Sequence, residues 1–266
     1  MSLSPRSARL CALVTLPLAG LLVTAPAAAN VPLPDPSAPG DFAARSVPQW
    51  NFPRANGNDP CWPEAAFDSA GAPADGGAVQ NWPNSDGGCA PHGSAFPTYY
   101  TAQRCSSDEY RVTFTIYQAT SGFRPSGHRH DFEHVDVVWR RSGTTWVRDR
   151  LLLSAHGGHR VVAWGSAESW DAVRASAGLG REHPRVFVGF GSHSMFNNQG
   201  GLKDVLSAYT NNEYRQADYR VWADQPGGLV EVVRDGALYQ AFDANAAAWG
   251  SADSNPAKMA REACSH

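Results

Sequence analysis

Hydrophobic and polar residues alternate along several short segments of the chain. In residues 110–117 Tyr, Val, Phe and Ile occupy one face, while Arg and two Thr residues occupy the other. This period of two is typical of a strand with one buried face. Arg141-Ser142-Gly143 marks a hairpin turn. Further strand-like runs cover residues 135–139, 146–153, 160–164, 186–190, 219–223 and 229–233.

Helical patterns are few and short. Residues 166–177 and 242–249 could each form a short helix, and Asn255-Pro256 predicts the cap and first residue of another. Strands that follow one another with few helices between them indicate a mainly β protein. We therefore predict an antiparallel β-sandwich with a few peripheral helices, built as a single domain from residues 61–266.

The N-terminal 60 residues differ from the rest of the chain. Arg6 and Arg9 precede an apolar stretch and a run of small residues, so residues 1–29 are predicted to be a secretory signal peptide. An uncleaved membrane anchor is the alternative, but the apolar stretch is short for a membrane span. Residues 30–60 contain seven of the 19 prolines and are expected to form a Pro-rich arm. Residues 61–100 are expected to be loop that packs through aromatic side chains.

Composition narrows the functional classes. The 22 basic and 25 acidic residues form no basic run, which argues against nucleic-acid binding. After signal removal an even number of cysteines remains, which indicates two disulfides in an oxidising compartment. Three pairings are possible, and the spacing does not choose among them. The four cysteines are Cys61, Cys89, Cys105 and Cys264.

The densest chemistry lies in residues 126–134, which contain three histidines and two carboxylates. On an extended backbone Asp131 and Glu133 project to the same side, and a turn at Gly127 can bring His128 to join them. One imidazole and two carboxylates suit a hard divalent ion, Mg or Ca, that keeps several waters. A solvated polar network in a surface loop is the alternative. His156 and His193 follow later strands and are weaker candidates.

An enzyme remains a further alternative. The chain has no nucleophile elbow, phosphate loop or dinucleotide fingerprint. A metal hydrolase would use His128, His130 and Glu133, with Glu133 or Asp131 as general base. The spacing of these residues is not that of an open zinc site.

Residues 127–133, Gly-His-Arg-His-Asp-Phe-Glu, closely resemble the heptapeptide Gly-His-Arg-His-Asp-Trp-Glu of the necrosis- and ethylene-inducing-peptide-like proteins. Two later blocks are also similar to family segments. Ser154-Ala155-His156-Gly157-Gly158 looks like the Ser-x-His-Gly segment, and residues 183–193 look like the His-Pro-x-Val block. The resemblance extends from Cys61 to Trp249.

The resemblance implies a secreted, non-enzymatic β-sandwich similar to actinoporins and fungal lectins. Such a protein binds the sugar headgroup of plant glycosyl inositol phosphoryl ceramides and damages the plasma membrane. It would contact the membrane peripherally and is expected to be a monomer in solution. The resemblance also implies a Cys61–Cys89 pair, with Cys105 and Cys264 as an extra bridge. It places His128, Asp131 and Glu133 at the ion, His193 as a further functional histidine, and Arg129, His130, Phe132 and His156 among the ligand-binding candidates.

The sequence departs from the family pattern at two places. Phe132 replaces the motif Trp, which removes an indole donor and keeps the aromatic bulk. The family also has an aspartate shortly before the motif, where this chain has Thr120 or Ser121. Loss of that carboxylate predicts weaker ion binding. It favours, as an alternative function, a lectin-like module that binds glycans without damaging membranes.

Overall fold

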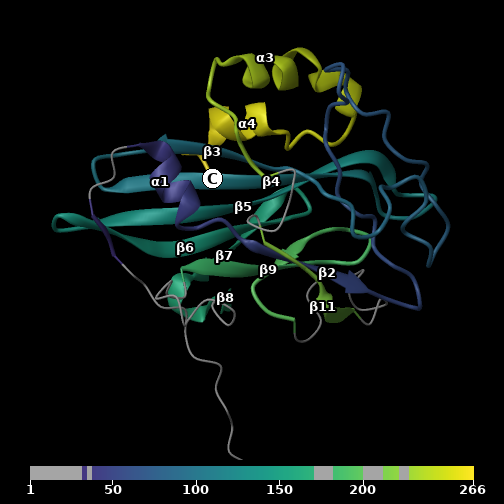
Figure 1. The fold of residues 1–266 in the computed structure, drawn as a ribbon, viewed down its shortest axis with the longest axis horizontal. Helices are drawn as coiled ribbons and strands as arrows, with labels where there is room; N and C mark the ends of the chain where they lie inside the picture. Colours follow the sequence, from purple (N-terminus) through teal and green to yellow (C-terminus); the bar gives the residue numbers. More distant parts are fainter. Residues whose placement is uncertain (1–31, 35–37, 171–181, 200–211, 222–227) are drawn as a thin grey trace, which may run out of the picture.

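The alternating segment at residues 110–117 forms the middle of a long strand in the larger of two β-sheets. The computed structural model describes residues 32–34, 38–170, 182–199, 212–221 and 228–266; the predicted signal peptide lies outside them. In Figure 1 the smaller sheet covers one face of the larger sheet, and helices α3 (Ala237–Ala244) and α4 (Pro256–Glu262) cover the other. The predicted mainly β sandwich with few helices is confirmed.

The larger sheet contains most of the strands that the sequence predicted. β4 (Glu109–Ser121) pairs with β3 (Thr98–Arg104) and with β5 (His128–Ser142). The hairpin between β5 and β6 (Thr145–Ala155) turns at Gly143 as expected. The order across this sheet is β1 (Leu33–Pro34), β6 (Thr145–Ala155), β5 (His128–Ser142), β4 (Glu109–Ser121), β3 (Thr98–Arg104) and β12 (Leu229–Glu231), with β7 (Gly158–Ala163) also paired to β6.

The smaller sheet brings together strands that are distant in the sequence. β9 pairs in parallel with β2, and β12 pairs in parallel with β3 of the other sheet. The sheets are therefore mixed, and the expectation of purely antiparallel pairing is wrong for these two pairs. The order is β10 (Met195–Phe196), β9 (His183–Val188), β2 (Gln49–Arg54) and β11 (Glu213–Arg220), with β8 (Ser169–Trp170) beside β9.

The segment expected to be an N-terminal arm is instead part of the sandwich. Helix α1 (Pro39–Ala44) buries Phe42, which stacks on Tyr110 at 4.1 Å between ring centroids. Strand β2 buries Trp50 and Phe52 between the sheets. Burial of these aromatic rings stabilises the packed position of the segment. Two of its prolines stand where proline is tolerated, Pro39 at the first residue of α1 and Pro34 at the last residue of β1.

Two apolar layers hold the elements together. The first lies between the sheets and includes Phe114, Val135 and Leu153. The second lies between the larger sheet and the C-terminal helices and includes Phe132 and Trp249. Its helical side is formed by α3 (Ala237–Ala244), the 3-10 helix η4 (Ala246–Trp249) and α4 (Pro256–Glu262). β5 therefore carries buried side chains on both of its faces.

The helices agree only in part with expectation. Asn255 caps α4 as predicted, because its side chain accepts hydrogen bonds from two backbone N–H groups of the first turn. The helix expected at 242–249 is divided between the end of α3 and η4. The helix expected at 166–177 is wrong in its described part, which contains the end of the 3-10 helix η1 (Trp164–Ser166) and β8. Among the described residues no helix is long and apolar enough to cross a membrane.

Two disulfides are present. Cys61 bonds to Cys89, and Cys105 bonds to Cys264, so the pairing implied by the resemblance is confirmed. The second bridge joins residues 159 positions apart and ties the C-terminal segment to the turn between β3 and β4.

Candidate functional site

The predicted motif lies on strand β5 rather than in a loop before it. β5 begins at His128, and its residues pair with β4 in constant register from Ser121↔His128 to Glu109↔Arg140. Phe132 faces the helical layer, whereas Val135 faces the second sheet. Because side chains alternate along a strand, Asp131 and Glu133 share the face of Val135. The sequence prediction that the two carboxylates project to one side agrees with this geometry.

Asp131 is held by a histidine from the smaller sheet. The Nδ1 atom of His193 lies 2.7 Å from Oδ2 of Asp131, and both side chains are buried. His193 stands in the turn between β9 and β10 with a positive φ of 57°, two residues after Gly191, whose φ is 81°. The other ring nitrogen of His193, Nε2, is buried without a hydrogen-bond partner. The turn thus holds His193 against a motif carboxylate through Nδ1.

Glu133 is held by the neighbouring strand. The hydroxyl of Ser154 on β6 donates a hydrogen bond to Oε2 of Glu133 and accepts one from the backbone N–H of His134. Two residues further on, exposed His156 approaches the β9–β10 turn, with Nε2 3.4 Å from Oγ of Ser194. The β6–β7 and β9–β10 turns therefore meet beside the two carboxylates.

His128 points its Nδ1 at backbone oxygens. This atom lies 2.9 Å from the carbonyl of His130, to which it can donate, and Nε2 then carries the lone pair. Across the β4–β5 pair His128 faces Ser121, and Thr120 lies beside it with Oγ1 3.5 Å from Sγ of Cys89. Neither residue at this place is a carboxylate, as the sequence indicated.

His130 and Phe132 belong to the opposite face of the strand. His130 has a φ of 58°, and its Nδ1 lies 2.8 Å from the hydroxyl of Tyr117. Burial and the positive charge of Arg129 lower the pKa of His130. Phe132 packs against Tyr117 and Trp249, with ring centroids 5.0 and 5.2 Å away. These two motif residues shape the strand and its packing.

Arg129 connects the motif to a preceding loop. Its guanidinium donates to the backbone carbonyl of Asp75, and the adjacent Gly76 lies so close to His130 that a Cβ there would be 2.6 Å from the imidazole. Glycine at 76 is required by this approach and by its φ of 70°. His130 is thereby separated from Glu133, so the described geometry does not assemble the His128, His130 and Glu133 set of the hydrolase alternative.

Comparison with known proteins decides the family. Residues 49–184, more than half of the chain, match the family model described as Necrosis inducing protein (NPP1). The chain belongs to the necrosis inducing protein family. The motif segment and the Ser154 and His156 region of this family member lie within the match.

Solved structures are similar at low identity. Necrosis and Ethylene inducing Protein 2, from the causal agent of cocoa's witches' broom disease, is 19% identical, with 65% of this chain and 74% of that chain covered and a TM-score of 0.45. The non-toxic HaNLP3 protein is 16% identical over 80% and 84% of the two chains, with a TM-score of 0.46. NLPPya in complex with mannosamine is 20% identical over 76% of each chain, with a TM-score of 0.45. Among curated proteins no sequence matches this family member.

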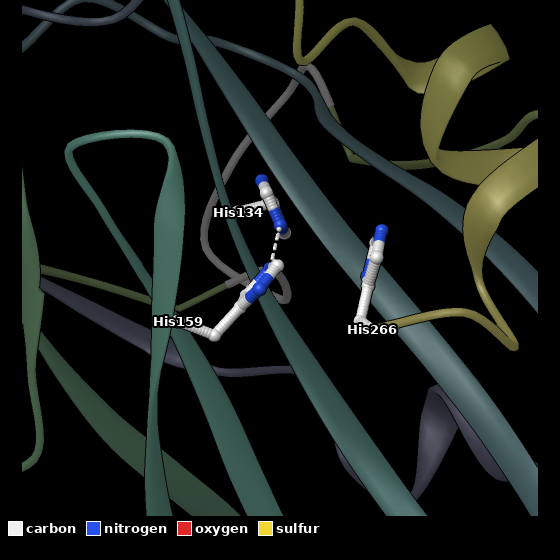
Figure 2. A group of neighbouring side chains, drawn as sticks. All are labelled: His134, His159 and His266. Carbon is white, nitrogen blue, oxygen red and sulfur yellow. Dashed lines mark hydrogen bonds between the residues drawn. The ribbon is translucent and has the colours of Figure 1, made fainter.

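Sequence reasoning missed residues that the fold brings to the motif strand. The sequence gives no role to Ser154 or Ser194, although they contact Glu133 and His156. A second group, His134, His159 and His266, also escaped notice. Their ligand nitrogens gather within 4.8 Å, the one such trio among the described His, Cys, Asp and Glu residues (Figure 2). No motif in the sequence pointed to His266, because no other histidine lies near it along the chain.

Proposed function

We propose that this protein is a secreted, non-enzymatic member of its family that binds the sugar headgroup of plant plasma-membrane sphingolipids and permeabilises the membrane. A divalent ion, Mg or Ca, would mediate the binding. Family membership supports this proposal. The observation that carries it is the placement of Asp131 and Glu133 on one face of β5, with Asp131 held by Nδ1 of His193.

The donor types present suit a hard divalent ion, although the ligand atoms of His128, Asp131 and Glu133 do not gather within 4.8 Å of one another as those of the histidine trio do. Carboxylate oxygens are the donors that Mg and Ca prefer, and both ions keep waters that sugar hydroxyls can replace. Asp131 and Glu133 would hold the ion, and His128 would join through its Nε2 atom. His193 and Ser154 hold the two carboxylates in place. When bound, the ion would supply the positive charge that orients the sugar hydroxyls.

Export from the cytoplasm is part of the proposal. Two disulfides, together with the predicted signal peptide at residues 1–29, support an oxidising extracellular compartment. Contact with the membrane would be peripheral and through the headgroup, and the protein would be a monomer in solution.

Binding is tested by co-sedimentation with vesicles that contain glycosyl inositol phosphoryl ceramide, with and without Mg. Glu133→Gln removes one charge from the ion site at constant shape, and Glu213→Gln, on an exposed position of β11, is the matched control. We expect wild type and Glu213→Gln to sediment only with Mg, and Glu133→Gln to stay in solution. Equal sedimentation of all three proteins without Mg would contradict the proposal.

A second function is favoured by Thr120 and Ser121. These neutral residues flank the start of the motif strand, where Ser121 pairs with His128. With one carboxylate fewer, the site would bind an ion and a glycan more weakly. The protein would then be a lectin-like module without cytolytic activity. Vesicle binding without dye release would support this alternative.

A further inference from the structure

Three imidazoles meet on the face of the larger sheet opposite the motif carboxylates. Nε2 of His134 lies 2.8 Å from Nε2 of His159, and the ring centroid of His266 lies 4.6 Å from that of His159 and 5.7 Å from that of His134. Figure 2 shows His134 and His159 joined by a hydrogen bond, with His266 beside them. The side chains of His134 and His266 are buried, whereas His159 is partly accessible.

Strand pairing brings the first two histidines together. His134 is on β5 and His159 is on β7, on either side of β6. The residue between them is Ser154, which pairs with His159 and accepts a hydrogen bond from the backbone of His134. Its short side chain leaves room for the two rings to meet above β6.

The third histidine is delivered by the C-terminal segment. Cys264, two residues before His266, is bonded to Cys105 in the turn between β3 and β4. Arg111 on β4 donates hydrogen bonds to the backbone carbonyls of Ala263 and His266. Disulfide, guanidinium and helix α4 together hold His266 over the sheet, so the cluster is built by several independent constraints.

A buried carboxylate orients His266. Oδ2 of Asp136, on β5, lies 2.9 Å from Nδ1 of His266, and Asp136 has no exposed surface. This contact fixes the proton on Nδ1 and leaves the lone pair on Nε2. A carboxylate behind a histidine is the arrangement that orients imidazole ligands in zinc sites.

The spacing fits one ion better than a simple hydrogen-bonded cluster. Two imidazole nitrogens on a tetrahedral zinc lie about 3.3 Å apart, given zinc–nitrogen bonds of about 2.0–2.1 Å. The 2.8 Å between His134 and His159 needs only a small opening to reach that distance.

We propose that His134, His159 and His266 form a zinc site, with Asp136 as the residue that positions His266. The fourth position is open to water on the partly accessible side. This site lies on the opposite face of β5 from the motif carboxylates, and its ligands differ in chemistry. Three neutral nitrogens select zinc and similar borderline ions, whereas the motif carboxylates select Mg or Ca. Zinc here would join β5, β7 and the C-terminal segment.

The test is metal binding by the full protein after chelator treatment. Zinc is titrated against a chromophoric competitor, and Co²⁺ is added separately, because four-coordinate Co²⁺ has a strong visible absorption. We expect one zinc per chain, a Co²⁺ spectrum typical of four-coordination and a higher melting temperature with zinc. Excess Mg should displace none of the zinc.

Variants assign the ligands. His159→Ala removes a ligand and is expected to weaken zinc binding by more than about 100-fold. Asp136→Asn removes only the carboxylate that orients His266, so we expect zinc binding to weaken by about 10- to 100-fold. His266→Ala removes another ligand and gives a second ligand variant if one misfolds. His92→Gln, a histidine that contacts Asp218 outside the trio, is the control and should bind zinc as wild type does.

Three results would overturn the inference. The first is wild-type protein that binds no zinc above background, and the second is folded His159→Ala and His266→Ala proteins that bind zinc as tightly as wild type. The third is loss of zinc in Glu133→Gln with the trio intact, which would assign the zinc to the motif carboxylates. Each variant is prepared without residues 1–29, and its correct folding is checked by circular dichroism and by a free-thiol count of zero, since the four cysteines after residue 29 are paired.

Discussion

Removal of the Cys105–Cys264 bridge should destabilise the protein strongly. The double change Cys105→Ala and Cys264→Ala opens a loop that spans 159 residues, and the chain-entropy relation gives a loss of about 5 kcal/mol. Both cysteines are at least partly accessible, so alanine leaves little cavity and the loss is mainly entropic. The bridge also holds the segment that contains His266, so zinc binding should weaken in the same variant.

The assay is equilibrium unfolding in guanidinium chloride, with the free energy of unfolding extrapolated to water. Cys61→Ala with Cys89→Ala is the internal comparison, because this bridge spans 28 residues and the same relation gives about 3.6 kcal/mol. Loss of the longer bridge should therefore lower the unfolding free energy by about 1.5 kcal/mol more than loss of the shorter one, before packing is considered. Cys61 is buried, so alanine at this position also removes packing contacts, which reduces the difference between the two double variants.

A loss below about 2 kcal/mol for the Cys105–Cys264 variant would refute the reasoning, since that value lies under the range usual for native bridges. It would mean that α4 and the contacts of Arg111 hold the C-terminal segment without help from the disulfide, or that the unfolded chain stays compact.

Three further predictions concern stability. Phe132→Ala should cost about 3–5 kcal/mol in unfolding free energy, because the ring is buried against Tyr117 and Trp249; a loss near zero would contradict that packing. Asn255→Ala should cost about 1 kcal/mol by the same measurement, because two N–H groups of α4 lose their acceptor, whereas an unchanged value would show that the cap is dispensable. Burial lowers the pKa of His134 to about 4 from an ordinary 6.5, so between these pH values the unfolded chain binds a proton that the folded protein does not. The zinc-free protein should therefore have its full stability above pH 6.5 and lose stability as the pH falls toward 4. Urea unfolding midpoints measured across this pH range should change less in His134→Gln than in wild type.

The strands of the larger sheet could be predicted because their signal is local. Alternation in residues 110–117 and the turn at Gly143 depend on neighbours in sequence, and both match the structure. Trp50 and Phe52 alternate too, but only within a short run among prolines, so the pattern was interpreted as an arm. Parallel pairing of β2 with β9 joins segments more than 130 residues apart and leaves no local trace.

The motif site was predicted from residue density and resemblance, and its key geometry followed from strand alternation. Asp131 and Glu133 share a face because they are two residues apart on β5. The position of His130 could not be foreseen, since its positive φ and its contact with Tyr117 depend on the loop at Gly76. The trio of His134, His159 and His266 could not be predicted, because the Cys105–Cys264 disulfide brings His266 to the sheet from a distant part of the sequence.

Dye release tests the central claim most directly. Vesicles of plant plasma-membrane lipid are mixed with wild type, Glu133→Gln or Glu213→Gln, each treated with chelator and then supplied with Mg or Ca. The account predicts leakage by wild type and Glu213→Gln only after Mg or Ca is restored, and none by Glu133→Gln. Equal leakage by Glu133→Gln, or no leakage by folded wild type on vesicles to which it binds, would contradict the account.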